Sequence, residues 1–175
     1  MKKYELTDDT ITAGGRILHR IKALKSFSDV EEGDLGGYVE KEDNLDHSGE
    51  AWVSGNARVY GDARVYGDAQ VIGNAWVSGD ARVSGNAQVY GDAWVSGDAR
   101  VSGENDYTTA KGFGRNYRTT TFFRLQDGGI GVRCGCFYGT LDEFRKKVKE
   151  THKESKLGKE YLMLADLMEY KFKDE

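Results

Sequence analysis

Apolar and polar positions follow a fixed six-residue rhythm between residues 51 and 103. Each unit reads valine, any residue, glycine, Asn or Asp, alanine, any residue, and the first valine is Val53. Side chains alternate between the two faces of an extended segment, so each alanine shares a face with the valine two positions later. Glycine and Asx residues tolerate turn dihedral angles. The pattern therefore predicts short strands with small apolar residues inside and a bend after each strand.

A chain of this kind winds into a prism, and three units per coil give a triangular cross-section. Successive coils then pair as parallel β-structure at a spacing of about 4.8 Å. The outward residues stack in three columns, which are Arg64, Arg82 and Arg100; Arg58, Trp76 and Trp94; and Trp52, Gln70 and Gln88. The corners add a column of Asp62, Asp80 and Asp98.

Period six with valine and small residues inside resembles the hexapeptide-repeat left-handed parallel β-helix. The resemblance implies the left hand, and it implies a homo-oligomer, with a trimer favoured, that associates through flat faces. Arg and Trp are enriched at protein interfaces. The expected interface residues are Trp52, Arg58, Trp76, Trp94, Arg64, Arg82 and Arg100. The structural alternative is that these arginine stems and indole rings only cover the coil edges.

The repeat frame extends upstream, so about four coils are expected over residues 35–103. The frame puts Gly37 and Gly49 on its glycine positions, and Leu35, Val39, Leu45 and Ala51 on its inward positions. Lys41 and His47 interrupt the valine positions, as expected for an atypical terminal coil.

Residues 1–34 are expected to cap the open end of the prism, because a solenoid exposes unpaired strand edges there. Two β-rich runs around Ala13-Gly14-Gly15 predict a hairpin. In its second strand one face is expected to carry Ile17, His19, Ile21 and Ala23, and the other Leu18, Arg20, Lys22 and Leu24. His19 is then a strand-surface or cap residue.

After Gly103 the composition changes. Residues 104–118 are expected to form a glycine-rich linker, and residues 119–175 a small ββαα domain. A hairpin is predicted around residues 127–129. One face of its second strand is expected to carry Ile130, Val132, Cys134, Cys136 and Tyr138, which makes both cysteines small core residues.

Two helices are predicted after this hairpin. Thr140 and Glu143 form a capping box at the start of the first. Helical spacing of apolar residues predicts the second from about Lys156 to Phe172. The fold class expected for the whole chain is mainly β: a β-helix with an N-terminal hairpin cap and a C-terminal α+β domain.

Composition narrows the possible functions. The net charge is −4, with a mildly basic C-terminal part, which does not fit a duplex DNA binder. No apolar run is long enough for a membrane span, and the N-terminus lacks the apolar middle of a signal peptide. The two cysteines form no disulfide framework and no zinc set, so a reducing cytoplasmic location is expected, without metal or cofactor.

Hexapeptide-repeat proteins include many acyltransferases, and the resemblance implies for these a histidine base beside an acyl-CoA. This chain has three histidines, and none lies in the regular repeats. His47, in the first coil, is the residue on which an acyltransferase alternative depends. No catalytic residues are assigned. The aspartate column could attract a cation, but solvated corner carboxylates are the simpler interpretation.

A better candidate for binding is the segment GRNYRTTTFFR and its neighbours. Arginine forks, hydroxyl groups and ring faces suit a phosphate-bearing or planar ligand. The predicted ligand-binding residues are Arg115, Arg118, Thr120, Phe122, Arg124, Arg133 and His152. The structural alternative is an exposed arginine face with the aromatic rings packed against the helices.

The flanking segments MKKYELTDDTI and CGCFYGTLDEFRKKVKETH resemble those of hexapeptide-repeat proteins encoded by bacteriophages and prophages. That resemblance implies a non-enzymatic phage accessory protein in the host cytoplasm. Its partner would be a nucleotide-like anion or a host protein, and counter-defence by sequestering a phosphorylated signal is the sharper version.

Overall fold

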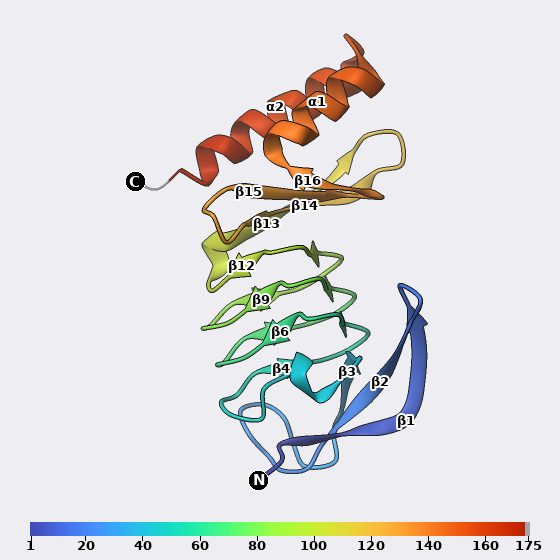
Figure 1. The fold of residues 1–175 in the computed structure, drawn as a ribbon, viewed down its shortest axis with the longest axis vertical. Helices are drawn as coiled ribbons and strands as arrows, with labels where there is room; N and C mark the ends of the chain where they lie inside the picture. The colour runs from blue at the N-terminus through green and yellow to red at the C-terminus, as the bar shows by residue number, and fades with distance from the viewer. Residues whose placement is uncertain (174–175) are drawn as a thin grey trace. The chain divides into compact units, whose positions relative to one another are not determined.

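The computed structural model describes residues 1–173 (Figure 1). The chain divides into two units, Met1–Glu104 and Asn105–Glu175. The first unit contains a β-solenoid and an N-terminal hairpin. The second contains a four-stranded sheet and two helices. The mainly β fold class predicted from the repeat is confirmed, and the hand of the helix stays the expectation that the resemblance carries. No helix among residues 1–173 combines the length and apolar character needed to cross a membrane.

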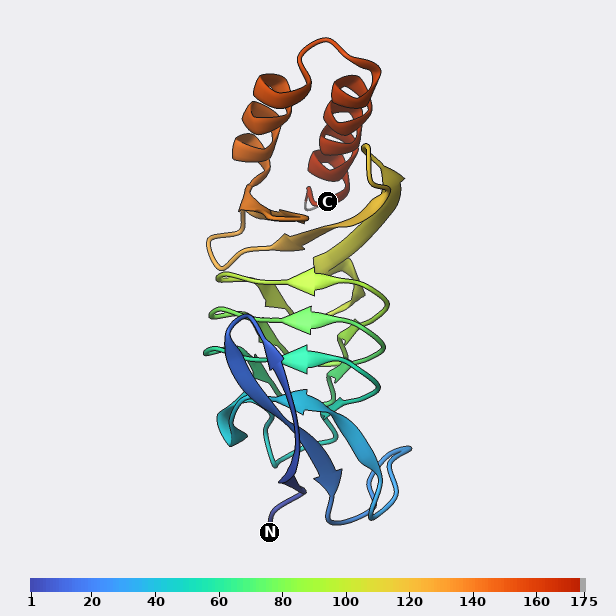
Figure 2. The same ribbon diagram turned by 90° about the vertical axis from the view of Figure 1, so that its right-hand side faces the viewer.

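Nine two-residue strands form the regular coils (Figures 1 and 2). They are β4 (Trp52–Val53), β5 (Arg58–Val59), β6 (Arg64–Val65), β7 (Gln70–Val71), β8 (Trp76–Val77), β9 (Arg82–Val83), β10 (Gln88–Val89), β11 (Trp94–Val95) and β12 (Arg100–Val101). They pair in parallel in three columns, whose orders are β5-β8-β11, β4-β7-β10 and β6-β9-β12. These pairings confirm the three predicted columns of outward residues.

The solenoid interior is built from the repeated alanines and valines, which are at most 1% exposed. Each coil bends at a glycine with positive φ, such as Gly79 at 69°. A Cβ added to Gly79 would lie 2.9 Å from the backbone nitrogen of Gly97 in the next coil. Glycine is therefore required at this corner for two reasons, the left-handed backbone and the close approach of stacked turns.

The first coil departs from the repeat register. Strand β3 (Leu35–Val39) pairs Val39 with Val59, and a bridge joins Leu45 to Val65, so the offset is 20 residues instead of 18. The 18-residue offset begins at β4, which places a two-residue insertion around His47.

Two predictions for the first coil are therefore wrong. Gly37 is a strand residue facing inward, because an added Cβ would meet the carbonyl oxygen of Ala57 at 2.7 Å. Leu35 is 57% exposed and does not face the interior.

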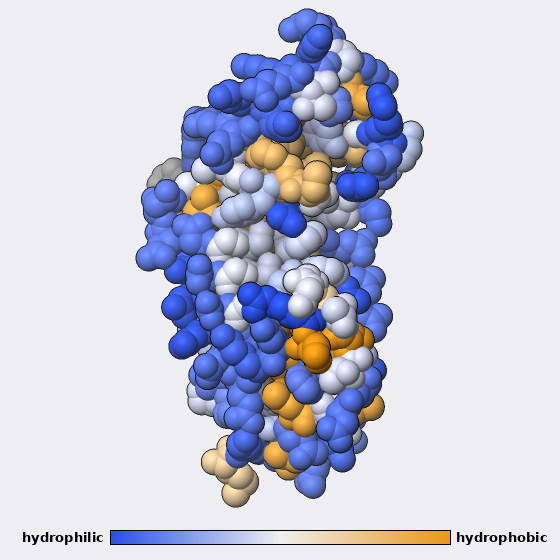
Figure 3. All heavy atoms as spheres, turned by 45° about the vertical axis from the view of Figure 1, so that its right-hand side comes forward, coloured by the Kyte–Doolittle hydropathy of each residue, from blue (hydrophilic) through white to orange (hydrophobic). Residues whose placement is uncertain are grey.

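The N-terminal hairpin consists of β1 (Tyr4–Ala13) and β2 (Arg16–Ala23), joined by Gly14 and Gly15, both with positive φ. It lies against the face of β5 and β8, and β2 also pairs with β3 (Figure 2). Both faces of β2 are partly covered, because Leu18, Ile21 and Ala23 are all buried. Apolar side chains of the hairpin region also reach the surface (Figure 3).

The second unit has the sheet order β13-β14-β15-β16, all antiparallel. Its elements are η2 (Glu104–Asp106), β13 (Tyr107–Phe113), β14 (Arg118–Arg124), β15 (Ile130–Cys134), β16 (Phe137–Thr140), α1 (Leu141–His152) and α2 (Lys156–Lys171). The hairpin at residues 127–129, both helices and the Thr140–Glu143 capping box are confirmed.

Two predictions for the second unit are wrong. Residues 107–113 of the expected linker form a strand that pairs with β14, so the unit is ββββαα. Cys136 lies in the turn after β15 and is exposed, because the predicted single strand ends at Cys134 and reverses. Phe137 packs against the helical core in its place, and Tyr138 is 42% exposed.

Candidate ligand pocket

Three of the predicted ligand-binding residues converge on one hollow of about 170 Å³ in the second unit. Arg115 comes from the loop between β13 and β14, Arg118 begins β14, and His152 ends α1. The antiparallel pairing of β13 with β14 brings this loop to the edge where β15 turns into β16. The sequence segment and the distant histidine therefore meet, as the prediction required.

The floor of the pocket is made by Tyr161 of α2 and Cys134 of β15, whose Oη and Sγ atoms are 3.9 Å apart. Burial and the neighbouring Cys134 raise the pKa of Tyr161 to about 12, so its hydroxyl stays protonated at neutral pH. The ring of His152 lies 5.7 Å from the Tyr161 ring, measured between centroids. The floor thus offers a hydroxyl, a thiol and ring faces.

Two glycines allow the side chains to approach the backbone. A Cβ at Gly135 would lie 2.6 Å from an Nη atom of Arg118, so the guanidinium group rests on the turn between the two cysteines. A Cβ at Gly114 would overlap the Tyr161 hydroxyl, and Gly114 has φ +74°. Both glycines have positive φ, and the pocket depends on their lack of a side chain.

The other four predicted ligand-binding residues do not line this pocket. Phe122 is fully buried in the core beneath the helices, and buried Thr120 donates to Cys134 Sγ at 3.2 Å. Arg124 forms an ion pair with Asp106 at 3.4 Å. Arg133 pairs with Thr121, one position out of phase with the Phe122 face, so it lies on the opposite face of the sheet.

Several pocket residues were missed from the sequence. Phe113 and Asn116 fell in the expected linker, and Tyr161 fell in the predicted second helix, where it is also buried. The β-prone Tyr, Thr and Phe residues of the segment YTTAKGF were the available signal for β13.

The outward residues of the solenoid differ in how accessible they are. Trp52 is only 6% exposed, because Phe27 covers it at a centroid distance of 5.4 Å, so the prediction of Trp52 as a surface residue is wrong. Arg58 lies over the Trp76 ring at 4.7 Å, and the Trp76 and Trp94 centroids are 4.9 Å apart.

In the column of Arg64, Arg82 and Arg100, Arg64 is exposed and Arg82 is half-buried. An Nη atom of Arg100 donates to the carbonyl oxygens of Asp80, Asp98 and Ala99.

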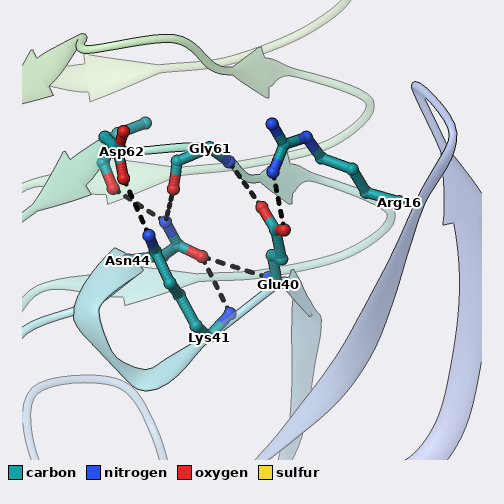
Figure 4. Close-up of polar contacts among 7 residues, drawn as sticks. Arg16, Glu40, Lys41, Asn44, Gly61 and Asp62 are labelled. Atoms are coloured by element: carbon teal, nitrogen blue, oxygen red, sulfur yellow. Dashed lines mark hydrogen bonds and ion pairs between the residues drawn. The ribbon is translucent and has the colours of Figure 1, made fainter.

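A polar network fixes the corner that follows β3 in the first coil (Figure 4). The fully buried Asn44 donates to the carbonyl oxygens of Gly61 and Ala63 at 3.0 and 2.9 Å. Burial alone raises the pKa of Glu40, but hydrogen bonds from the Gly61 N–H and from Arg16 outweigh it, so the net pKa is lowered. This network holds the hairpin to the coil, because the Glu40 carboxylate binds both Arg16 of the hairpin and the Gly61 N–H.

The comparison with protein families agrees with the geometry. The YdcK β-solenoid repeat model matches residues 51–67, 63–79, 75–91 and 87–103. The chain is a β-solenoid repeat protein. The matched segments span less than half of the chain, and no curated protein matches it. Within residues 1–173, no group of three or more His, Cys, Asp or Glu side chains is placed to hold a metal ion.

Proposed function

We propose that this protein is a non-enzymatic scaffold whose C-terminal unit binds a small anionic ligand. The observation that carries the proposal is the convergence of Arg115, Arg118 and His152 on one pocket with a hydroxyl and aromatic floor. Arginine presents a rigid fork of donors that matches the oxygens of phosphate and carboxylate groups.

The size of the pocket limits what enters it. Sites that enclose a drug-sized molecule start at about 300 Å³, and this hollow has about 170 Å³. It has room for a phosphate group or a comparable fragment, and the remainder of a nucleotide-like ligand would extend past the exposed Arg115 and Cys136.

The role of the β-solenoid in this proposal is to assemble copies, with a trimer favoured, through outward Arg and Trp residues other than the buried Trp52 and the pair Arg64 and Arg82. The phage origin, the host cytoplasm and the sequestration of a phosphorylated host signal belong to the same proposal. They are supported by the resemblance of the flanking segments.

The contacts of His47 speak against the acyltransferase alternative. Its Nδ1 accepts a hydrogen bond from the Lys3 backbone N–H at 3.2 Å, which assigns the proton of the neutral ring to Nε2. A general base needs a free lone pair pointed at its substrate, and here the lone pair is occupied by the backbone.

Isothermal titration with AMP, ADP-ribose and inorganic phosphate tests the proposal. Binding in the wild type that weakens at least tenfold in Arg118→Gln, but not in Arg124→Gln, is the expected result. Absence of binding to every compound, or equal binding by both variants, would contradict it. Acetyl-CoA serves as the probe for the acyltransferase alternative.

A further inference from the structure

A second and larger hollow, of about 440 Å³, lies in the first unit beside the first coil. One side is formed by η1 (Glu42–Asn44) and the loop that follows it, and the other by residues of β6 and β9. The volume is within the range of small-molecule sites. The hollow shares no lining residue with the C-terminal pocket.

The irregular register of the first coil creates this hollow. The 20-residue offset makes Asn44 the neighbour of Arg64 in the column of outward residues. Asn44 instead turns inward to the carbonyl oxygens of Gly61 and Ala63 and is fully buried. Arg64 therefore has no outward side chain stacked on its N-terminal side, and the two-residue insertion holding His47 forms the wall there.

The two arginines of the hollow have no ion-pair partner. Glu42 is paired with Lys2, and hydrogen bonds from Ser48 and the charge of Lys3 lower the pKa of Asp46, which stays ionised. Among the described residues, neither Arg64 nor Arg82 forms an ion pair. Two guanidinium groups thus line the hollow unpaired, beside the carboxylates of Asp43 and Asp46.

The two arginines are direct neighbours. The β6–β9 register pairs Arg64 with Arg82, so they stand one coil apart, at about 4.8 Å along the column. Like charges at this spacing repel each other, and an anion between them would relieve the repulsion. The planar forks of two arginines can hold a carboxylate or a phosphate by several charge-assisted hydrogen bonds.

A third donor lines the same hollow. The Nε2 atom of His47 is buried and has no hydrogen-bond partner among the described residues, and its distance to Glu42 Oε2 is 3.9 Å. Because Nδ1 accepts from Lys3, Nε2 carries the proton. A buried donor without a partner is unfavourable, and a ligand oxygen would satisfy it.

We propose that this hollow binds the carboxylate or phosphate group of a small anionic molecule, with Arg64 and Arg82 as paired forks and the His47 Nε2–H as the third donor. This site is independent of the C-terminal pocket and rests on different residues. His47 acts in it as a hydrogen-bond donor.

The experiment is isothermal titration of the full-length protein with citrate and, separately, with inorganic phosphate. The variants are Arg64→Gln, Arg82→Gln and the double variant. Arg124→Gln is the matched control, because Arg124 lines neither hollow, and Arg118→Gln reports separately on the C-terminal pocket. We expect one probe to bind the wild type at this hollow, each of the Arg64 and Arg82 single variants to weaken that binding about tenfold, and Arg124→Gln to leave it unchanged. The responding probe shows whether a carboxylate or a phosphate is preferred.

Tryptophan emission and thermal unfolding of each variant should match the wild type, because both arginine side chains reach solvent. Undiminished binding by the correctly folded double variant would overturn the inference, and so would the absence of binding by the wild type. Binding lost only in Arg118→Gln would overturn it as well and leave the proposed function standing.

Discussion

Lys3 closes the N-terminal end of the β-solenoid, and its replacement by methionine tests how that end is stabilised. The Lys3 side chain is completely buried, and its Nζ donates to the carbonyl oxygen of Ala51 at 2.7 Å. It also lies 5.1 Å from the centroid of the Phe27 ring. The Ala51 carbonyl belongs to a coil that has no regular coil before it. An ammonium group, which has only donors, therefore suits the position.

The buried position makes stability depend on pH. Burial lowers the pKa of Lys3 from 10.5 to about 8. Between these values the unfolded chain binds a proton at Lys3 that the folded chain has released, so the free energy of unfolding rises with pH. Linkage between pH 7 and pH 9.5 gives a rise of about 2 kcal/mol. Burial also raises the pKa of Tyr4, which reduces stability above about pH 10, so the measurement stays below that pH.

Lys3→Met removes both the buried charge and the donor. At pH 7 the relief of the charge offsets the unsatisfied Ala51 carbonyl, which costs about 1–3 kcal/mol. We therefore expect a small change at pH 7, and at pH 9.5 a variant about 2 kcal/mol less stable than the wild type.

Urea unfolding followed by tryptophan fluorescence is the assay. All three tryptophans lie in the Met1–Glu104 unit, so the signal reports on the solenoid. Lys2→Met is the matched control, because the Lys2 side chain is 58% exposed, and it should keep the wild-type rise. A Lys3→Met variant whose stability still rises by 2 kcal/mol would refute the reasoning.

Two further substitutions test the corners of the solenoid by the same assay. Asn44→Ala leaves two carbonyl and two N–H groups without their partner and should cost about 3 kcal/mol, whereas the exposed Asn56→Ala should cost less than about 0.5 kcal/mol; similar losses would contradict the structural role of the buried amide. Gly79→Ala should cost more than Gly91→Ala, although both glycines have φ +69°, because only the first Cβ meets the next coil. Backbone strain alone costs about 1–2 kcal/mol, and equal losses would show that stacked turns can move apart.

The regular coils could be predicted to the residue, because a fixed period determines which side chains stack. The alanine and valine positions and the pairing of Trp76 with Trp94 followed directly from the six-residue unit. The first coil could not be predicted this way. Its inward position at residue 37 is a glycine, and the frame read that glycine as a turn.

The C-terminal unit shows a different limit. Its helices carry caps and apolar spacing that act locally, and both were predicted correctly. Strand β13 is held by pairing with β14, which is a non-local interaction, and its own sequence is polar with one glycine. The linker interpretation therefore failed, and Phe113 and Asn116 of the pocket were missed with it.

The same reasoning explains where polar groups converge in this protein. Inside the regular coils every inward position is alanine or valine, so the interior offers no polar side chain. The two hollows with arginine and histidine occur where regular structure is interrupted, at the insertion around His47 and at the loop before Arg118. An interruption turns a side chain out of its column, as Asn44 does beside Arg64, and the vacated position becomes a hollow. In a β-solenoid, breaks in the period are therefore the positions at which function should be sought first.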